Sequence, residues 1–120
     1  MSIPIERIGP SAFHGDRLRQ KGTVAVAFLA DWCPFCRSFE PEFARLAGVK
    51  GLRLYVADLT DLDSPLWDTF AVEVVPTVVV FDEGAAVHRA DGVAGAGLGS
   101  SDLEAIEQAA RSALRPPRTG

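Results

Sequence analysis

The sequence of 120 residues is poor in the residue types that several classes of protein require. It holds only two cysteines, which are too few for a disulfide framework or for a complete zinc site within one chain. No apolar run approaches the roughly 20 residues that cross a bilayer, so we expect no membrane span. Lys and Arg number 12 against 16 Asp and Glu. Nucleic-acid binding is therefore not expected, since phosphate contacts need clustered basic residues.

The N-terminal residues lack the charged-then-apolar pattern of a secretory leader, so we expect a cytoplasmic protein. Hydrophobic residues make up 48% of the chain, enough to build one core. We expect a single domain over residues 1–114, acting as a monomer. Residues 115–120 contain two prolines, which cannot continue a helix, and we expect a disordered tail there.

The two cysteines, Cys33 and Cys36, stand between a strand-like run and a helix-like run. Residues 23–29 are small apolar and β-branched, which is typical of a strand buried on both faces. Phe39 and Phe43 then recur at helical spacing. Cys33 is therefore expected at a helix N-terminus, where N–H groups and the helix dipole stabilise a thiolate. The loop between the cysteines is too short for a disulfide to add much stability, which favours redox chemistry.

Further landmarks follow this pair in a fixed order. Trp32 precedes the first cysteine, Pro41 falls five residues after the second, Val75-Pro76-Thr77 opens a strand-like run, and Asp91-Gly92-Val93 closes the next one. With these landmarks the chain resembles the thioredoxin family over nearly its whole length. The resemblance implies an α/β thioredoxin fold with a central mixed β-sheet and helices on both of its faces.

The order of elements that we expect is β-α-β-α-β-α-β-β-α. Its first helix begins at Pro10 and is ended by Gly22, and a short helix opens at Ser64-Pro65. Residues 77–81 and 85–90 form an antiparallel hairpin. Residues 92–101 contain four glycines without the lysine of a phosphate-binding loop, so we interpret them as a flexible loop. Ser100 or Ser101 is then expected to cap a last amphipathic helix.

The resemblance also implies a mechanism and a substrate surface. Cys33 is the nucleophile that attacks a substrate disulfide and Cys36 the resolving thiol, so the redox-active Cys33–Cys36 disulfide replaces any cofactor. The Val75–Pro76 bond is expected to be cis. Substrates are disulfide-containing proteins, and electrons come from a thioredoxin-reductase-type donor. A small apolar docking patch is expected from six residues: Trp32, Pro34, Val75, Pro76, Gly92 and Val93.

Three departures from the family pattern affect the chemistry. The position of the usual buried aspartate is Ala27, and its lysine partner is replaced near Asp58. We therefore hypothesise that water or Asp58 transfers the proton. The residues between the cysteines are Pro34-Phe35 where typical thioredoxins have Gly-Pro, and a proline there looks more like glutaredoxins or bacterial disulfide oxidases. The direction of electron flow therefore stays open.

Several alternatives compete with a protein-disulfide reductase. The same fold could serve a disulfide oxidase, an isomerase or a glutaredoxin-like protein, although no glutathione-site signature follows the last strand. The cysteine pair could be half of a metal or iron–sulfur site completed by a second subunit. The chain could also be a binding module in which redox activity is incidental. The resemblance favours the reductase.

Overall fold

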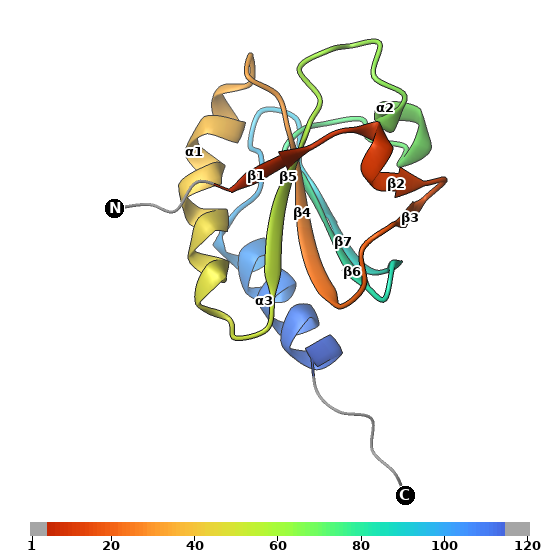
Figure 1. Ribbon diagram of the computed structural model, residues 1–120. Helices are drawn as coiled ribbons and strands as arrows, with labels where there is room; N and C mark the ends of the chain where they lie inside the picture. The colour runs from red at the N-terminus through yellow and green to blue at the C-terminus, as the bar shows by residue number, and fades with distance from the viewer. Residues whose placement is uncertain (1–4, 115–120) are drawn as a thin grey trace, which may run out of the picture.

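The computed structural model describes residues 5–114, so the predicted tail at 115–120 lies outside the described residues. Five strands form one mixed sheet in the order β1-β5-β4-β6-β7 (Figure 1). Their bounds are β1 Glu6–Ile8, β4 Thr23–Leu29, β5 Arg53–Asp58, β6 Thr77–Asp82 and β7 Ala85–Asp91. Strands β1, β5 and β4 run parallel to one another, β6 pairs antiparallel with β4, and β7 pairs antiparallel with β6. The predicted mixed sheet is confirmed.

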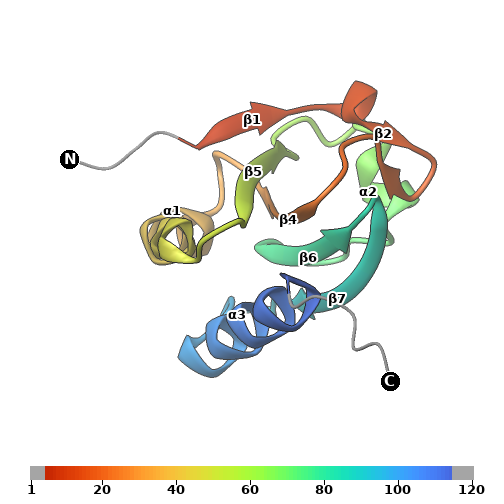
Figure 2. The same cartoon turned by 60° about the horizontal axis from the view of Figure 1, so that its bottom comes forward.

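Strand β4 lies at the centre of this sheet, and all seven of its residues are buried. Its β-branched and small side chains suit a strand covered on both faces, as the sequence predicts. Figure 2 shows which elements provide the cover: α1 (Pro34–Ala44) and α3 (Ser100–Leu114) lie on one face, and the short α2 (Leu66–Thr69) lies on the other. A 3₁₀ turn, η2 (Arg45–Gly48), follows α1 directly.

The predicted first helix is wrong. The segment forms a 3₁₀ turn, η1 (Pro10–Ala12), and then a hairpin of β2 (Phe13–His14) and β3 (Arg17–Leu18). Phe13 and Leu18 are cross-strand partners in this hairpin, and both are buried. Their spacing of five residues suits facing strands and not one stripe of a helix. Gly15 allows the reversal between them, since its φ is +58°.

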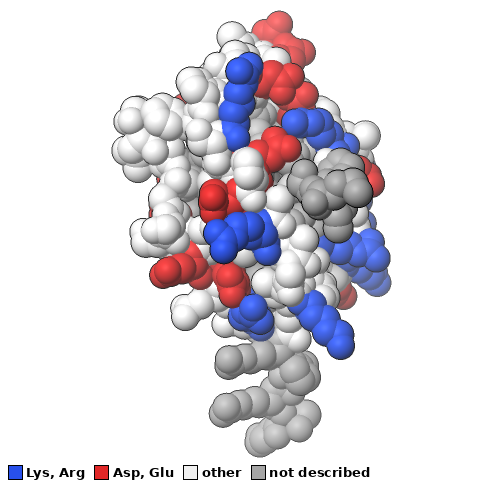
Figure 3. Space-filling view, turned by 90° about the vertical axis from the view of Figure 1, so that its left-hand side faces the viewer, with Lys and Arg blue, Asp and Glu red and all other residues white. Residues whose placement is uncertain are grey.

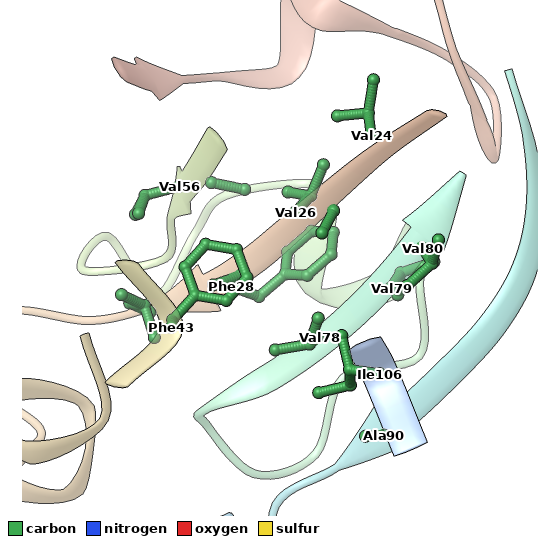
Figure 4. Packing of buried hydrophobic residues seen from close by; sticks show 14 of the residues in the cluster. Val24, Val26, Phe28, Phe43, Val56, Val78, Val79, Val80, Ala90 and Ile106 are labelled. Atoms are coloured by element: carbon green, nitrogen blue, oxygen red, sulfur yellow. The ribbon is translucent and has the colours of Figure 1, made fainter. Parts of the chain in front are cut away.

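The core has a layer on each face of the sheet. On the face of α2, four phenylalanines pack together, with Phe13 and Phe70 each contacting Phe28 of β4 at ring-centroid distances of 6.3 and 5.1 Å. On the opposite face, Phe43 of α1 and Ile106 of α3 are fully buried against the sheet (Figure 4). Because side chains alternate along a strand, Ala27 and Leu29 point away from the phenylalanine layer, towards α1 and α3.

The last hairpin and helix follow the prediction with one correction. Strands β6 and β7 are joined at Glu83 and Gly84, whose φ values of +51° and +88° give the tight turn that suits twisted strands. Asp102 caps the start of α3 from within the helix, because its carboxylate accepts a hydrogen bond from the Gly99 N–H at 2.8 Å. Ser100 lies inside the helix, so neither predicted serine is the cap residue.

Candidate active site

The register of the strands brings four segments of the chain together at one end of the sheet. Strands β4 and β5 both end there, with Leu29 beside Asp58. Thr77, at the start of antiparallel β6, pairs with Phe28 on one side and with Asp91, the last residue of β7, on the other. The loops that follow or precede these residues carry the two cysteines, Thr60, Pro76 and Gly92. The site is therefore assembled by strand pairing.

Cys33 is the N-cap residue of α1 and Cys36 lies in its first turn. The Cys36 N–H donates to Cys33 Sγ at 3.3 Å, and the Cys33 thiol donates to the Val75 carbonyl at 3.5 Å. Both cysteines are free thiols. Cys36 is 2% exposed, as expected for an inner thiol, whereas Cys33 is only 5% exposed and not at an open helix start. The loop at Val75 covers it.

Burial raises the pKa of the Cys36 thiol to about 12, and its hydrogen bond with Cys33 adds to this shift. Desolvation disfavours the charged form of any acid, which is the physical reason for the direction. Cys36 is therefore a neutral thiol near pH 7. Before it can attack another sulfur, its proton must be removed.

The loop that faces Cys33 is held by a close backbone approach. The Val75–Pro76 peptide bond is cis. Gly92 lies against this loop so tightly that a Cβ atom there would come within 2.4 Å of the Pro76 carbonyl oxygen. The position accepts only glycine, because the atom that a Cβ would meet belongs to the backbone of Pro76 and cannot rotate away as a side chain could.

Hydrogen bonds to Thr60 hold Trp32 beside the cysteines. The Trp32 indole N–H donates to the Thr60 carbonyl at 3.0 Å, and the Thr60 hydroxyl accepts from the Asp31 N–H at 2.8 Å. Trp32 is 52% exposed and stacks on Trp67, with ring centroids 6.3 Å apart and planes inclined by 8°. Trp67 therefore lines the site from α2, and nothing in the local sequence pairs it with Trp32.

Asp58 in turn holds Thr60 in place. Its carboxylate Oδ1 accepts from both the N–H and the hydroxyl of Thr60, at 2.9 and 2.6 Å. Burial pushes the pKa of Asp58 up, but these Thr60 hydrogen bonds and the charge of Arg7 outweigh it, so the pKa is lowered. The geometry gives Asp58 a positioning role towards Trp32, and its transfer of a proton stays a prediction.

The predicted docking patch is divided into an outer and an inner part. Trp32, Pro34 and Val93 are exposed, Gly92 is half-buried, and Val75 and Pro76 lie buried beneath them.

Phe35 also belongs to this surface, because it is 40% exposed and packs against Gly97. The loop at residues 92–101 is more defined than predicted, since the Val93 N–H donates to the Gly97 carbonyl at 3.0 Å and the Gly97 N–H returns a bond to Val93 at 2.8 Å. Its glycines at 95 and 97 take φ values of +80° and +72° in this turn. Substrate docking on the patch stays a prediction.

Residues 5–114 contain no cluster of three or more His, Cys, Asp and Glu side chains placed to hold a metal ion. None of their helices has the length and hydrophobicity to cross a bilayer.

Comparison with known proteins identifies the family. The family model for thioredoxin matches residues 6–104. Thioredoxin from Mycolicibacterium smegmatis is 33% identical over 87 residues, covering 70% of this chain and 78% of that protein. Spinach chloroplast thioredoxin f has a TM-score of 0.71 at 20% identity, covering 89% of this chain and 93% of that one. The chain belongs to the thioredoxin family.

Protein disulfide-isomerases are also among its relatives. Protein disulfide-isomerase like 2-2 from Arabidopsis thaliana is 32% identical over 84 residues, which is 69% of this chain and 19% of that protein. The chain thus spans about a fifth of the length of the isomerases that it matches. Together with the closely placed cysteine pair, these relatives support a thiol–disulfide oxidoreductase function.

The close approach at Gly92 predicts the effect of adding one methyl group. Gly92→Ala should lower the free energy of unfolding by about 1–3 kcal/mol, because the loop must move away from the new Cβ. Gly48→Ala is the matched control, since a Cβ there would meet no atom within 4 Å. Urea unfolding of both variants measures the difference. Equal stability of the two would contradict this account of the loop.

The raised pKa of Cys36 predicts how stability depends on pH. The pKa of Cys36 in the folded state, about 12, lies above the ordinary value of 9.0. The contribution of this thiol to the free energy of unfolding is therefore complete below pH 9 and is lost as the pH rises towards 12. We expect the reduced wild type to lose stability relative to reduced Cys36→Ser above pH 9. Urea unfolding of both proteins from pH 7 to 11 tests it, and a constant difference would show that Cys36 is not shifted.

Proposed function

We propose that this chain reduces protein disulfides through its Cys33–Cys36 dithiol. One observation carries the proposal: Cys33 Sγ lies between the first turn of α1 and the Val75 carbonyl, with Cys36 buried one turn inward. The first turn of α1 supplies an N–H group and a dipole that stabilise negative charge on Cys33. The resolving thiol, that of Cys36, is protonated near pH 7.

Two successive exchanges account for the reduction. The Cys33 thiolate attacks one sulfur of a substrate disulfide, so that a mixed disulfide forms and the other substrate sulfur leaves as a thiolate. Cys36 then loses its proton and attacks Cys33 Sγ, which releases the second substrate sulfur. Two electrons have passed to the substrate, and the chain is left with a Cys33–Cys36 disulfide. A reductase of the thioredoxin-reductase type would return it to the dithiol.

The surface around the cysteines supports a protein substrate. Trp32, Phe35 and Val93 form an exposed apolar border around a cysteine that is itself nearly covered. An extended segment could lie across this border and pair with the loop at Val75, as strands add to a sheet edge. The substrates, the electron donor, the monomeric state and the cytoplasmic location belong to this proposal and rest on the sequence and the family.

Single cysteine variants test the proposed order of events. Cys33→Ser should reduce a disulfide-linked protein no faster than buffer does, because the nucleophile is gone. Cys36→Ser should still attack but should stop at the mixed disulfide, which mass spectrometry detects as a covalent adduct. If Cys33→Ser kept its activity, the proposed nucleophile would be wrong. If a variant with both Cys33→Ser and Cys36→Ser still bound a partner protein, a binding module would be supported instead of the enzyme.

A second candidate, a disulfide oxidase or isomerase, is favoured by Pro34 after the nucleophile and by the isomerase relatives. The reduction potential separates the two directions. We expect about −270 mV, the value typical of a reductase, whereas about −180 to −120 mV would support the oxidase or isomerase. Equilibration in thiol/disulfide buffers, followed by the fluorescence of Trp32 beside the pair, measures it.

A further inference from the structure

The resolving step needs a proton acceptor that β4 does not supply. Ala27 is fully buried in β4 on the face that α1 covers, at the position where the family pattern places an aspartate. Asp58, the acid at the end of β5, has one carboxylate oxygen engaged by two bonds from Thr60. Burial raises the pKa of Cys36, so its proton has to be removed before the thiol can attack. A second candidate acceptor lies on α1.

Cys36 borders a small cavity between α1 and the sheet. The cavity has a volume of about 290 Å³, enough for several water molecules. Its lining is Arg7, Leu29, Ala30, Asp31, Cys36, Arg37 and Glu40. The two carboxylates in this set are those of Asp31 and Glu40.

Asp31 and Glu40 differ in their setting. Asp31 is exposed in the loop before the cysteines, where its backbone groups bond to Thr60 and Arg37. Glu40 is half-buried and stands four residues after Cys36 on α1, so that both side chains lie on one face of the helix, a turn apart. Of the two acids, Glu40 has the closer structural relation to the resolving thiol.

Arg7 of β1 holds Glu40 at this cavity. Its guanidinium lies 3.4 Å from Glu40 Oε1 and links α1 to the edge strand. Acidic and basic side chains lie next to one another over the side of the molecule that carries α1 (Figure 3). An exposed pair of this kind adds little stability. What it does provide is a partner that keeps the Glu40 carboxylate beside the cavity at Cys36.

We propose that Glu40 accepts the proton of Cys36 in the resolving step, through water in this cavity, with Arg7 as its positioning partner. The inference rests on the proposed function. The Cys36 S–H bond breaks and the proton passes by way of water to the Glu40 carboxylate. The sulfur electron pair attacks Cys33 Sγ, the Cys33–Cys36 bond forms, and the substrate sulfur leaves with the electrons of the broken disulfide. Glu40 afterwards releases the proton to solvent.

The charges around Cys36 support this coupling. Glu40 is a coulombic cause of the raised pKa of Cys36, after burial and the contributions of Cys33. The other ionisable groups at the cavity are Arg7 from β1, Arg37 from α1 and Asp31 from the preceding loop. Loss of the Glu40 charge would lower the pKa of Cys36 and increase its thiolate fraction. A purely electrostatic role therefore predicts that Glu40→Gln resolves faster, whereas a proton acceptor predicts that it resolves more slowly.

Rapid mixing with a symmetric aromatic disulfide whose thiolate absorbs visible light separates the two exchanges. The first release of colour reports attack by Cys33 and the second reports resolution by Cys36, which Cys36→Ser identifies by lacking it. In Glu40→Gln at neutral pH we expect an unchanged first release and a second release slowed by about 100-fold. The difference should narrow as the pH rises, because hydroxide replaces the carboxylate. Glu40→Asp should recover part of the rate.

Glu42→Gln is the matched control, because Glu42 is on the same helix and pairs with Arg45 at 3.2 Å. Its second release should equal that of the wild type. An equal or faster second release in Glu40→Gln would overturn the role of Glu40. Slowing in Asp58→Asn but not in Glu40→Gln would assign the proton to Asp58 instead. If the wild type released no colour at all, the proposed reductase itself would fall, and the role of Glu40 with it.

Discussion

The contact between the Cys33 thiol and the Val75 carbonyl is the constraint on which the rest of the site depends. It requires the start of α1 and the loop before β6 to meet within hydrogen-bond distance of one sulfur. Pairing of β4 with β6 brings the two segments to the same edge, and the missing side chain at Gly92 lets the end of β7 close against Pro76. A substrate sulfur approaching Cys33 would meet the same loop.

The two thiols have the same chemistry and different surroundings. Cys33 lies at the start of α1 and at the border of the apolar patch, beneath the loop at Val75. Cys36 lies a turn deeper, where burial holds it protonated. In the proposed mechanism this difference sets the order of events, because the substrate sulfur cannot be displaced from Cys33 until the inner thiol loses its proton. The group that removes the inner proton therefore controls how long the mixed disulfide lasts.

The sequence predicts most of this fold because its strongest signals are local. The apolar run of β4, the tight turn at Glu83-Gly84 and the spacing of the cysteines each define their own element. The first helix was beyond this reasoning, because Phe13 and Leu18 are buried by pairing across a hairpin and not along a helix.

The site shows the same division between local and tertiary information. The cysteines, Trp32 and the loop at Pro76 follow from their order in the chain. Thr60 has no such signal, because its role is a set of bonds to residues nearly thirty positions away, at Asp31 and Trp32. Glu40 did have one, since its spacing of four from Cys36 places it on the same face of α1. What the sequence lacked was the cavity between them.

The position of the acid has a physical consequence for the whole domain. A carboxylate at position 27 would be buried in the central strand, where an ion without a partner costs several kcal/mol. Ala27 removes that cost and leaves the face under α1 apolar. Glu40 lies instead at the rim of the cavity, half-buried and paired with Arg7. The arrangement thus separates the stability of the core from the proton transfer that the inner cysteine requires.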